Sequence, residues 1–256
     1  MVRWMILAGG VAACLAAALC APRAWAADGE PTEELKFDLP EPFFGGTPFD
    51  YGASLDTFEP ESFKDRPPFM APKGTRVISK GKTVTASSPP ISGELKMITD
   101  GDKSYQEGSL VTLGPGAQWV QVDLGEAQEV FAVLLWHFHR GKRVYFDVIV
   151  QASGGPEFGQ DAVLLWNADR DNSLGLGAGK DKDYVDNNKG RLLDAKGQKA
   201  RYLRFFSNGN TENRNNHYVE IEVWGRPVKA AKPEESTGKD EPKEELKFEI
   251  PEPSCN

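Results

Sequence analysis

The chain has 256 residues, of which 39% are hydrophobic and 10% aromatic, and it carries a formal net charge of -8 at pH 7. This apolar content is enough for one sizeable core but thin for two, so we expect a single domain with tails. Nucleic acids and anionic membranes require a concentrated basic face, and the acidic balance therefore argues against either as the main partner.

The first 26 residues have the pattern of a secretory signal peptide. Arg3 precedes an almost wholly apolar run from Trp4 to Cys20, and Ala24-Trp25-Ala26 is the small-x-small pattern that signal peptidase accepts. The run is short for a bilayer span, so we expect cleavage after Ala26, no stable membrane span afterwards, and a secreted or periplasmic protein. A lipoprotein anchored at Cys14 is the alternative, because Val11-Ala12-Ala13-Cys14 resembles a lipobox. Cleavage after Ala26 leaves Cys255 as the one remaining cysteine, so no intramolecular disulfide can form.

Residues 27–72 are rich in Pro, Gly, Asp and Glu but also contain scattered aromatic side chains. Such a segment builds little regular structure, yet it is too aromatic for a solvated linker, so we expect an extended arm that lies on the domain or on a partner. Residues 228–256 are rich in Lys, Glu and Pro and are predicted to be a disordered tail.

A decamer is repeated in the arm and in the tail. Glu33–Pro42 reads Glu-Glu-Leu-Lys-Phe-Asp-Leu-Pro-Glu-Pro, and Glu244–Pro253 differs from it only by conservative changes. One interpretation is the relic of a duplicated linker. The other is a short linear motif that docks on a sheet edge or on a protein partner in the cell envelope.

Between the tails, residues 73–227 alternate short apolar runs with Gly, Asn, Asp and Pro, which predicts an all-β sandwich. Val130 to Phe138 is apolar at almost every position, as expected for a central strand covered on both faces. The expected strands are residues 76–79, 83–87, 95–98, 109–113, 119–124, 130–139, 145–152, 163–166, 201–207 and 218–224.

Four blocks occur in a characteristic order along this domain: Ile98–Asp102, Gln118–Gly125, Arg201–Phe205 and Val219–Gly225. Together they resemble the discoidin family, also called coagulation factor 5/8 type C domains, which has a galactose-binding-like fold. The resemblance implies a jelly-roll β-sandwich that binds a ligand without catalysis, similar to the carbohydrate-binding modules of this fold.

The Asp100-Gly101-Asp102 turn places two carboxylates beside Ser104, and hard oxygen ligands at such a turn suit calcium. In many discoidin-like modules this loop and a glutamate near the last strand hold a structural calcium ion. The resemblance therefore implies Ca²⁺ ligands at Asp100, Asp102, Ser104 and Glu220. The alternative is that the two aspartates only cap the turn through hydrogen bonds to the backbone.

A second acidic stretch, residues 169–183, is interrupted by glycines. It lacks the ligand order and closing glutamate of an EF-hand, and its glycine run lacks the Lys-Ser or Lys-Thr ending of a phosphate loop. We expect a long surface loop here.

Two polar clusters are the candidate ligand site. The first mixes an aromatic plate with planar donors, the combination that sugar rings and hydroxyls require; it comprises Trp136, His137, His139, Arg140 and Arg143. The second is an amide-rich loop, comprising Asn208, Asn210, Arg214, Asn215 and Asn216. The alternatives are that Trp136 belongs to the core and that the asparagines shape a loop through Asx turns.

His137 and His139 lie two apart on a predicted strand and so point to the same face, and His217 could complete a zinc site of the hydrolase type. Ordinary hydrogen bonds are the alternative. No Gly-x-Ser-x-Gly elbow supports nucleophilic catalysis. The sequence therefore favours an exported, non-catalytic module that binds carbohydrate at or outside the cell envelope. A protein-binding domain docked through the decamers is the second hypothesis, and a zinc-dependent hydrolase is the third.

Overall fold

The computed structural model describes residues 29–43, 45–48, 56–62, 64–104 and 108–228. The predicted signal peptide and the tail with the second decamer lie outside these residues. Within the described residues, no helix is long and apolar enough to cross a membrane.

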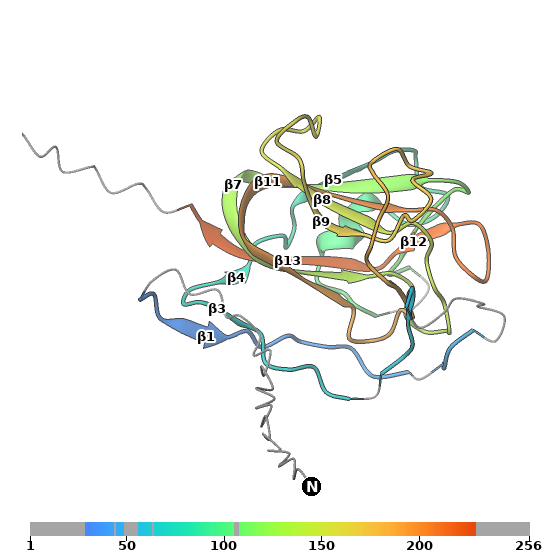
Figure 1. Ribbon diagram of the computed structural model, residues 1–256, viewed down its shortest axis with the longest axis horizontal. Coiled ribbons are helices and arrows are strands. Elements are labelled where there is room, and N and C mark those ends of the chain that lie inside the picture. Colours follow the sequence, from blue (N-terminus) through green and yellow to red (C-terminus); the bar gives the residue numbers. More distant parts are fainter. Residues whose placement is uncertain (1–28, 44, 49–55, 63, 105–107, 229–256) are drawn as a thin grey trace, which may run out of the picture.

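The fold is all-β, as the alternation of apolar residues predicts (Figure 1). The strands are β1 (Thr32–Glu34), β2 (Phe58–Glu59), β3 (Met70–Pro72), β4 (Arg76–Val77), β5 (Thr83–Ala86), β6 (Val111–Leu113), β7 (Gln118–Trp136), β8 (Ile149–Ser153), β9 (Val163–Asn167), β10 (Asp183–Tyr184), β11 (Arg191–Ser207), β12 (Asn216–Tyr218) and β13 (Glu220–Pro227).

The strand expected at residues 95–98 is wrong, because this segment forms the short 3-10 helix η1 (Leu95–Thr99). A 3-10 helix has three residues per turn, so Leu95 and Ile98 share one face, and both pack on the main core. The 3-10 helix therefore directs both side chains into the core, whereas a strand would point them to opposite faces.

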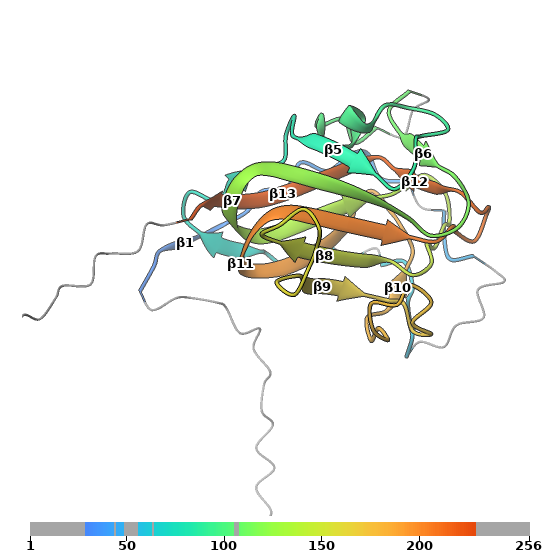
Figure 2. The ribbon, with the colours of Figure 1, turned by 90° about the horizontal axis from the view of Figure 1, so that it is seen from above.

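The main sheet has the strand order β4-β13-β7-β11-β8-β9, and β5 also pairs with β7. Two long strands, β7 and β11, run through both halves of the fold and curve as they do so (Figure 2). The start of β7 pairs with β5 and the end of β11, whereas its later part pairs with β13 and the start of β11. The sheet thus folds over onto itself as a sandwich.

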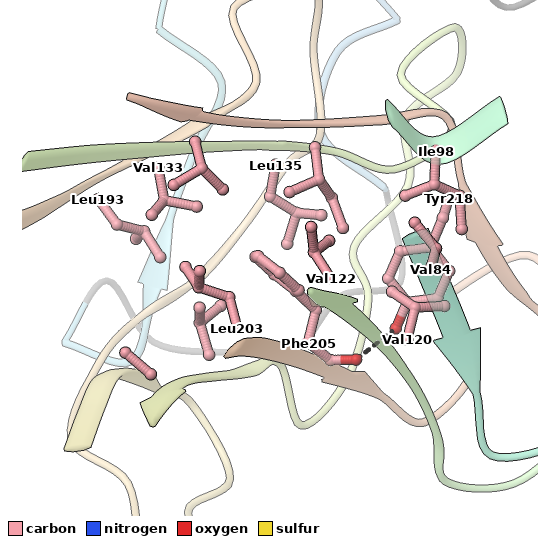
Figure 3. Close-up of a cluster of buried hydrophobic side chains, with 14 of the residues drawn as sticks. Val84, Ile98, Val120, Val122, Val133, Leu135, Leu193, Leu203, Phe205 and Tyr218 are labelled. Carbon is pink, nitrogen blue, oxygen red and sulfur yellow. Dashed lines mark hydrogen bonds between the residues drawn. The ribbon is translucent and has the colours of Figure 1, made fainter. Parts of the chain in front are cut away.

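Apolar side chains from both halves meet in one core (Figure 3). Val133 and Leu135 come from the later part of β7, and Val120, Val122 and Phe205 come from the other half. Residues 130–136 of β7 are all buried, which confirms the predicted central strand. Tyr218 closes one end of the core, where its hydroxyl donates a hydrogen bond to the carbonyl oxygen of Phe205.

The described part of the N-terminal arm packs along the sandwich rather than extending away from it (Figure 1). β1 pairs with β3 in antiparallel fashion, and β2 pairs with β10 in parallel. The arm thereby lies against both β13 and the loops that follow β10.

Candidate functional site

The aromatic plate predicted from the sequence lies inside the protein. Trp136 has none of its surface exposed, and its Nε1 donates a hydrogen bond of 2.9 Å to the carbonyl oxygen of Asn188. The ring therefore has no face open to a sugar, and the structure places Trp136 in the core. The reason is that β7 continues to this residue between β13 and β11, so that both of its faces are covered.

The three histidines are also buried, and each has its own partner. His137 Nδ1 lies 3.3 Å from Asp186 Oδ1, His139 Nε2 lies 2.9 Å from the carbonyl oxygen of Lys103, and His217 Nδ1 lies 2.9 Å from Tyr145 Oη. Burial, together with the charges of Arg143 and His137, lowers the pKa of His217 to about 4. Burial also lowers the pKa of His139.

In the described part of the chain, these imidazoles do not converge with other ligand atoms in the way a zinc site requires. His137 and His139 are accordingly internal hydrogen-bonding residues here, not surface groups that could reach a ligand.

Arg140 and Arg143 lie at the rim, where the arm crosses the end of the sandwich. The guanidinium of Arg140 sits 5.1 Å from the ring centre of Phe43, and that of Arg143 sits 4.3 Å from the ring of Phe138. Gly45 lies so close that a Cβ there would stand 2.8 Å from the backbone nitrogen of Lys142. The chain's own arm thus packs against the loop that the sequence predicts as a binding loop, while Arg140 remains exposed.

The amide-rich loop divides into buried and accessible side chains. The side chain of Asn216 is completely buried, and it uses its oxygen for Ser207 and Gly209 and its nitrogen for the carbonyl oxygens of Gly114 and Gly116. Such a side chain has no capacity left for a ligand.

Asn210 is buried too, and it bonds within its own loop to Asn213 and Asn215. Asn208, Asn210 and Arg214 line a shallow hollow of about 260 Å³, where Arg214 is exposed and the side-chain nitrogen of Asn208 donates to Asp147. Asn215 is half-buried beside this hollow. The loop is therefore shaped mainly by its own amides.

A larger cavity, of about 340 Å³, lies between the arm and the strands at the edge of the sandwich. One wall comes from residues within 59–62 and 64–67, and the other from residues within 184–192. We call it the arm cavity. Its volume falls in the range typical of small-molecule sites.

Three buried polar atoms of residues that line the arm cavity have no hydrogen-bond partner among the described residues: Tyr184 Oη, Asp186 Oδ2 and Arg191 Nε. Tyr184 is 6% exposed and Asp186 is 3% exposed. A buried polar group without a partner costs about 1–3 kcal/mol, so a ligand that supplies the missing hydrogen bonds is favoured.

Planar cations frame the same cavity. Arg66 donates to the carbonyl oxygens of Lys189 and Gly190 at 2.9 and 2.7 Å, and burial beside Arg191 lowers its pKa. Arg191 pairs with Glu59 at 2.9 Å and stacks on the rings of Trp166 and Tyr184. These contacts hold the two walls together and fix the donors in place.

Trp136 and His137, which the sequence predicts to bind a ligand, are buried and contact the 186–190 loop that forms one wall of this cavity. Gly190 has a φ of +62°, and a Cβ at this position would stand 2.6 Å from the Trp136 ring. Trp136 also binds Asn188, and His137 holds the other oxygen of Asp186. The predicted cluster therefore positions the 186–190 loop instead of contacting a ligand.

Three of the candidate calcium ligands, Asp100, Asp102 and Ser104, lie at one turn, and the fourth, Glu220, lies at the start of β13. Among the described residues, the three carboxylates do not form a group whose ligand atoms all lie within 4.8 Å of one another. Asp100 Oδ1 accepts from the Asp102 backbone nitrogen, and Asp102 Oδ1 accepts from that of Ser104, both at 2.8 Å. Glu220 is 1% exposed and accepts a hydrogen bond of 3.1 Å from Gly101 N. Burial, together with the neighbouring carboxylates, raises the pKa of Glu220 to about 9.

A different acidic trio comes together elsewhere. The carboxylates of Asp147, Asp169 and Asp171 have ligand atoms within 4.8 Å of one another. Hydrogen bonds from Ser173 and Leu174 already engage this group, and Asp171 is exposed. These contacts organise the start of the long acidic loop.

No protein-family model and no curated protein matches the chain. Among solved structures, a family 89 glycoside hydrolase from Clostridium perfringens is 21% identical with a TM-score of 0.45; the match covers 62% of this chain and 15% of the hydrolase. The CBM32 of AlyQ, solved with 4,5-unsaturated mannuronic acid, is 18% identical with a TM-score of 0.40, and the match covers 55% of this chain and 92% of that one.

A fucose-binding module of Streptococcus pneumoniae, SpX-3, is 16% identical with a TM-score of 0.42, and the match covers 58% of this chain and 96% of the module. The solved structures to which this chain is similar thus include CBM32 modules and a fucose-binding module.

Proposed function

We propose that this protein is an exported, non-catalytic module that binds a carbohydrate in the arm cavity. The observation that carries the proposal is a pair of buried oxygens, Tyr184 Oη and Asp186 Oδ2, which have no hydrogen-bond partner within the part of the chain that the structure describes and belong to residues lining a cavity of about 340 Å³. Sugar hydroxyls both donate and accept hydrogen bonds, so they can satisfy a carboxylate and a phenol at the same time.

The charges around the cavity favour a neutral polyhydroxyl ligand over a nucleotide. Its lining has four basic side chains and three acidic ones, which are Lys64, Arg66, Lys189, Arg191, Glu59, Asp65 and Asp186. A phosphate-rich ligand requires a clear excess of positive charge. A sugar needs fixed donors and acceptors in near balance, together with apolar surface of the kind that Pro60, Pro67 and Leu192 offer.

A structural Ca²⁺ ion at the Asp100–Ser104 turn is part of the same proposal. Glu220 supports it, because this buried carboxylate accepts a hydrogen bond of 3.1 Å from the backbone nitrogen of Gly101 and so lies beside the turn that carries Asp100 and Asp102. A divalent cation held with Asp100, Asp102 and Ser104 would stabilise the charge of this carboxylate. The ion would fix the turn and take no part in any reaction.

The test is a glycan array probed with the full chain, in the presence and absence of a calcium chelator. We expect binding to a defined set of neutral glycans, with weaker binding after chelation because the Asp-Gly turn loosens. An array without any hit, on a protein shown to be folded, would contradict carbohydrate recognition. Hits that do not respond to the chelator would contradict the calcium site alone.

A further inference from the structure

The first decamer lies in an apolar slot of its own domain, on the face formed by β7 and β13. Leu35 is 5% exposed and packs with Ala71, Phe131 and Ala132. Phe37 meets the ring of Trp224 edge-on at 5.3 Å and lies 6.4 Å from the ring of Phe69. We call this surface, formed by Phe69, Ala71, Phe131, Ala132, Leu192 and Trp224, the arm slot.

Polar contacts fix the segment along the slot. At its start, Arg226 Nη2 lies 3.0 Å from Glu30 Oε2, and Gly74 N donates to Glu33 Oε1 at 2.8 Å. Leu35 N donates to the carbonyl oxygen of Phe69 at 2.9 Å. Further along, Lys103 Nζ donates to the carbonyl oxygen of Asp38 at 2.7 Å.

The repeated segment extends three residues beyond the decamer at its N-terminal end. Residues 30–42 and 241–253 can be aligned without a gap, and ten of the thirteen positions are identical. The three that differ are Thr32, Asp38 and Leu39, and all three are exposed in the first copy.

Four residues that contact the slot through their side chains recur without change: Glu241 matches Glu30, Glu244 matches Glu33, and Leu246 and Phe248 match Leu35 and Phe37. Asp38, whose carboxylate lies 3.6 Å from Lys103 Nζ, is replaced by Glu249, which keeps the charge. The other contacts of the first copy use backbone atoms. The second copy therefore carries the groups that contact the slot in the first.

We propose that the arm slot binds the second copy, residues 241–253 of the same molecule, in exchange with residues 30–42. The first copy runs antiparallel to β13, because it meets Arg226 near its start and Trp224 further along. A chain that leaves β13 at Pro227 could therefore turn back and follow the same path. Residues 229–240 are the tether, and closing so short a loop gives a high effective concentration.

The exchange has a structural consequence at the other end of the slot. Residues 30–42 lead into Phe43 and Gly45, which contact Arg140 and the backbone of Lys142. When the second copy takes the slot, the first copy is released, and residues 254–256 replace residues 43–45 beside this loop. The inference is independent of carbohydrate binding, because it depends on the slot and not on the arm cavity.

Cys255 provides the test. In the alignment it falls between the positions of Phe43 and Gly45, and Gly45 lies against Lys142. We would introduce Lys142→Cys in a full chain carrying Cys14→Ser and Cys20→Ser, and measure disulfide formation with Cys255 under mild oxidation. The matched control is Glu157→Cys, an exposed position on the β8–β9 turn.

We expect an intramolecular disulfide with Lys142→Cys and little with Glu157→Cys. Adding Phe37→Ala weakens the first copy and should raise the disulfide yield at least threefold. Adding Phe248→Ala, which leaves the described domain unchanged, should lower the yield to that of the control. If Phe248→Ala leaves the disulfide yield unchanged, the proposal is wrong. If the disulfide forms only between molecules, the second copy does not bind the slot of its own molecule.

Discussion

Replacing Gly190 by alanine tests how tightly Trp136 packs against the 186–190 loop, because the added methyl group both strains the backbone and meets the Trp136 ring. The φ of Gly190 is +62°, a region that costs an L-residue about 1–2 kcal/mol. A Cβ would also stand 2.6–2.8 Å from three atoms of the Trp136 ring, which is buried and cannot move aside. Overpacking of this kind costs about 1–3 kcal/mol more. Gly190→Ala should therefore destabilise the fold by about 2–5 kcal/mol.

Gly81→Ala is the matched control, because Gly81 has a φ of +69° but no atom within 4 Å of the added Cβ. It should cost the backbone contribution alone, about 1–2 kcal/mol. Urea denaturation of both variants gives the free energy of unfolding from the midpoint and the slope. If the two variants are equally destabilised, Trp136 does not pack against the 186–190 loop as described, and the support for the arm cavity is wrong.

Two further predictions concern charge. A chelator should lower the Tm of the wild-type protein by about 5–10 °C, and Glu220→Gln should remove that response. A wild-type Tm that does not change with the chelator would contradict the calcium site. The pKa of His217 is lowered in the folded state to about 4, so stability should be complete above about pH 6.5 and fall by about 2 kcal/mol as the pH drops towards 4. His217→Gln should flatten this decline in urea titrations across the same pH range, and an unchanged slope would show that His217 is not responsible.

The sandwich could be predicted from the sequence because strands covered on one face alternate apolar and polar residues, whereas strands covered on both faces are apolar throughout. The residues at which β7 begins and ends could not be predicted in this way. Gly125 resembles a turn between two strands, yet β7 continues through it with a φ of +90°, and the pairing of β7 with β11 shifts register between Asp123 and Gln128, where the strand bends. The same residue type marks a turn and a bend, and only the pairing partners distinguish them.

The candidate site was harder to predict for a related reason. Trp136 and His137 satisfy the pattern of a binding plate and that of a covered central strand equally well, and burial on both faces decided between them. The arm cavity joins segments more than a hundred residues apart, through contacts such as the ion pair of Arg191 with Glu59. A single sequence contains no signal for that approach.

The most direct test of carbohydrate recognition in the arm cavity is Tyr184→Phe. Tyr184 Oη has no hydrogen-bond partner among the described residues, so removing it should leave the Tm unchanged or slightly higher. Affinity for the glycan found on the array, measured by calorimetry, should fall about threefold to tenfold, the equivalent of one lost hydrogen bond. Tyr202→Phe, on β11 and outside the cavity, should bind like the wild type. Equal affinity of all three proteins would contradict the account.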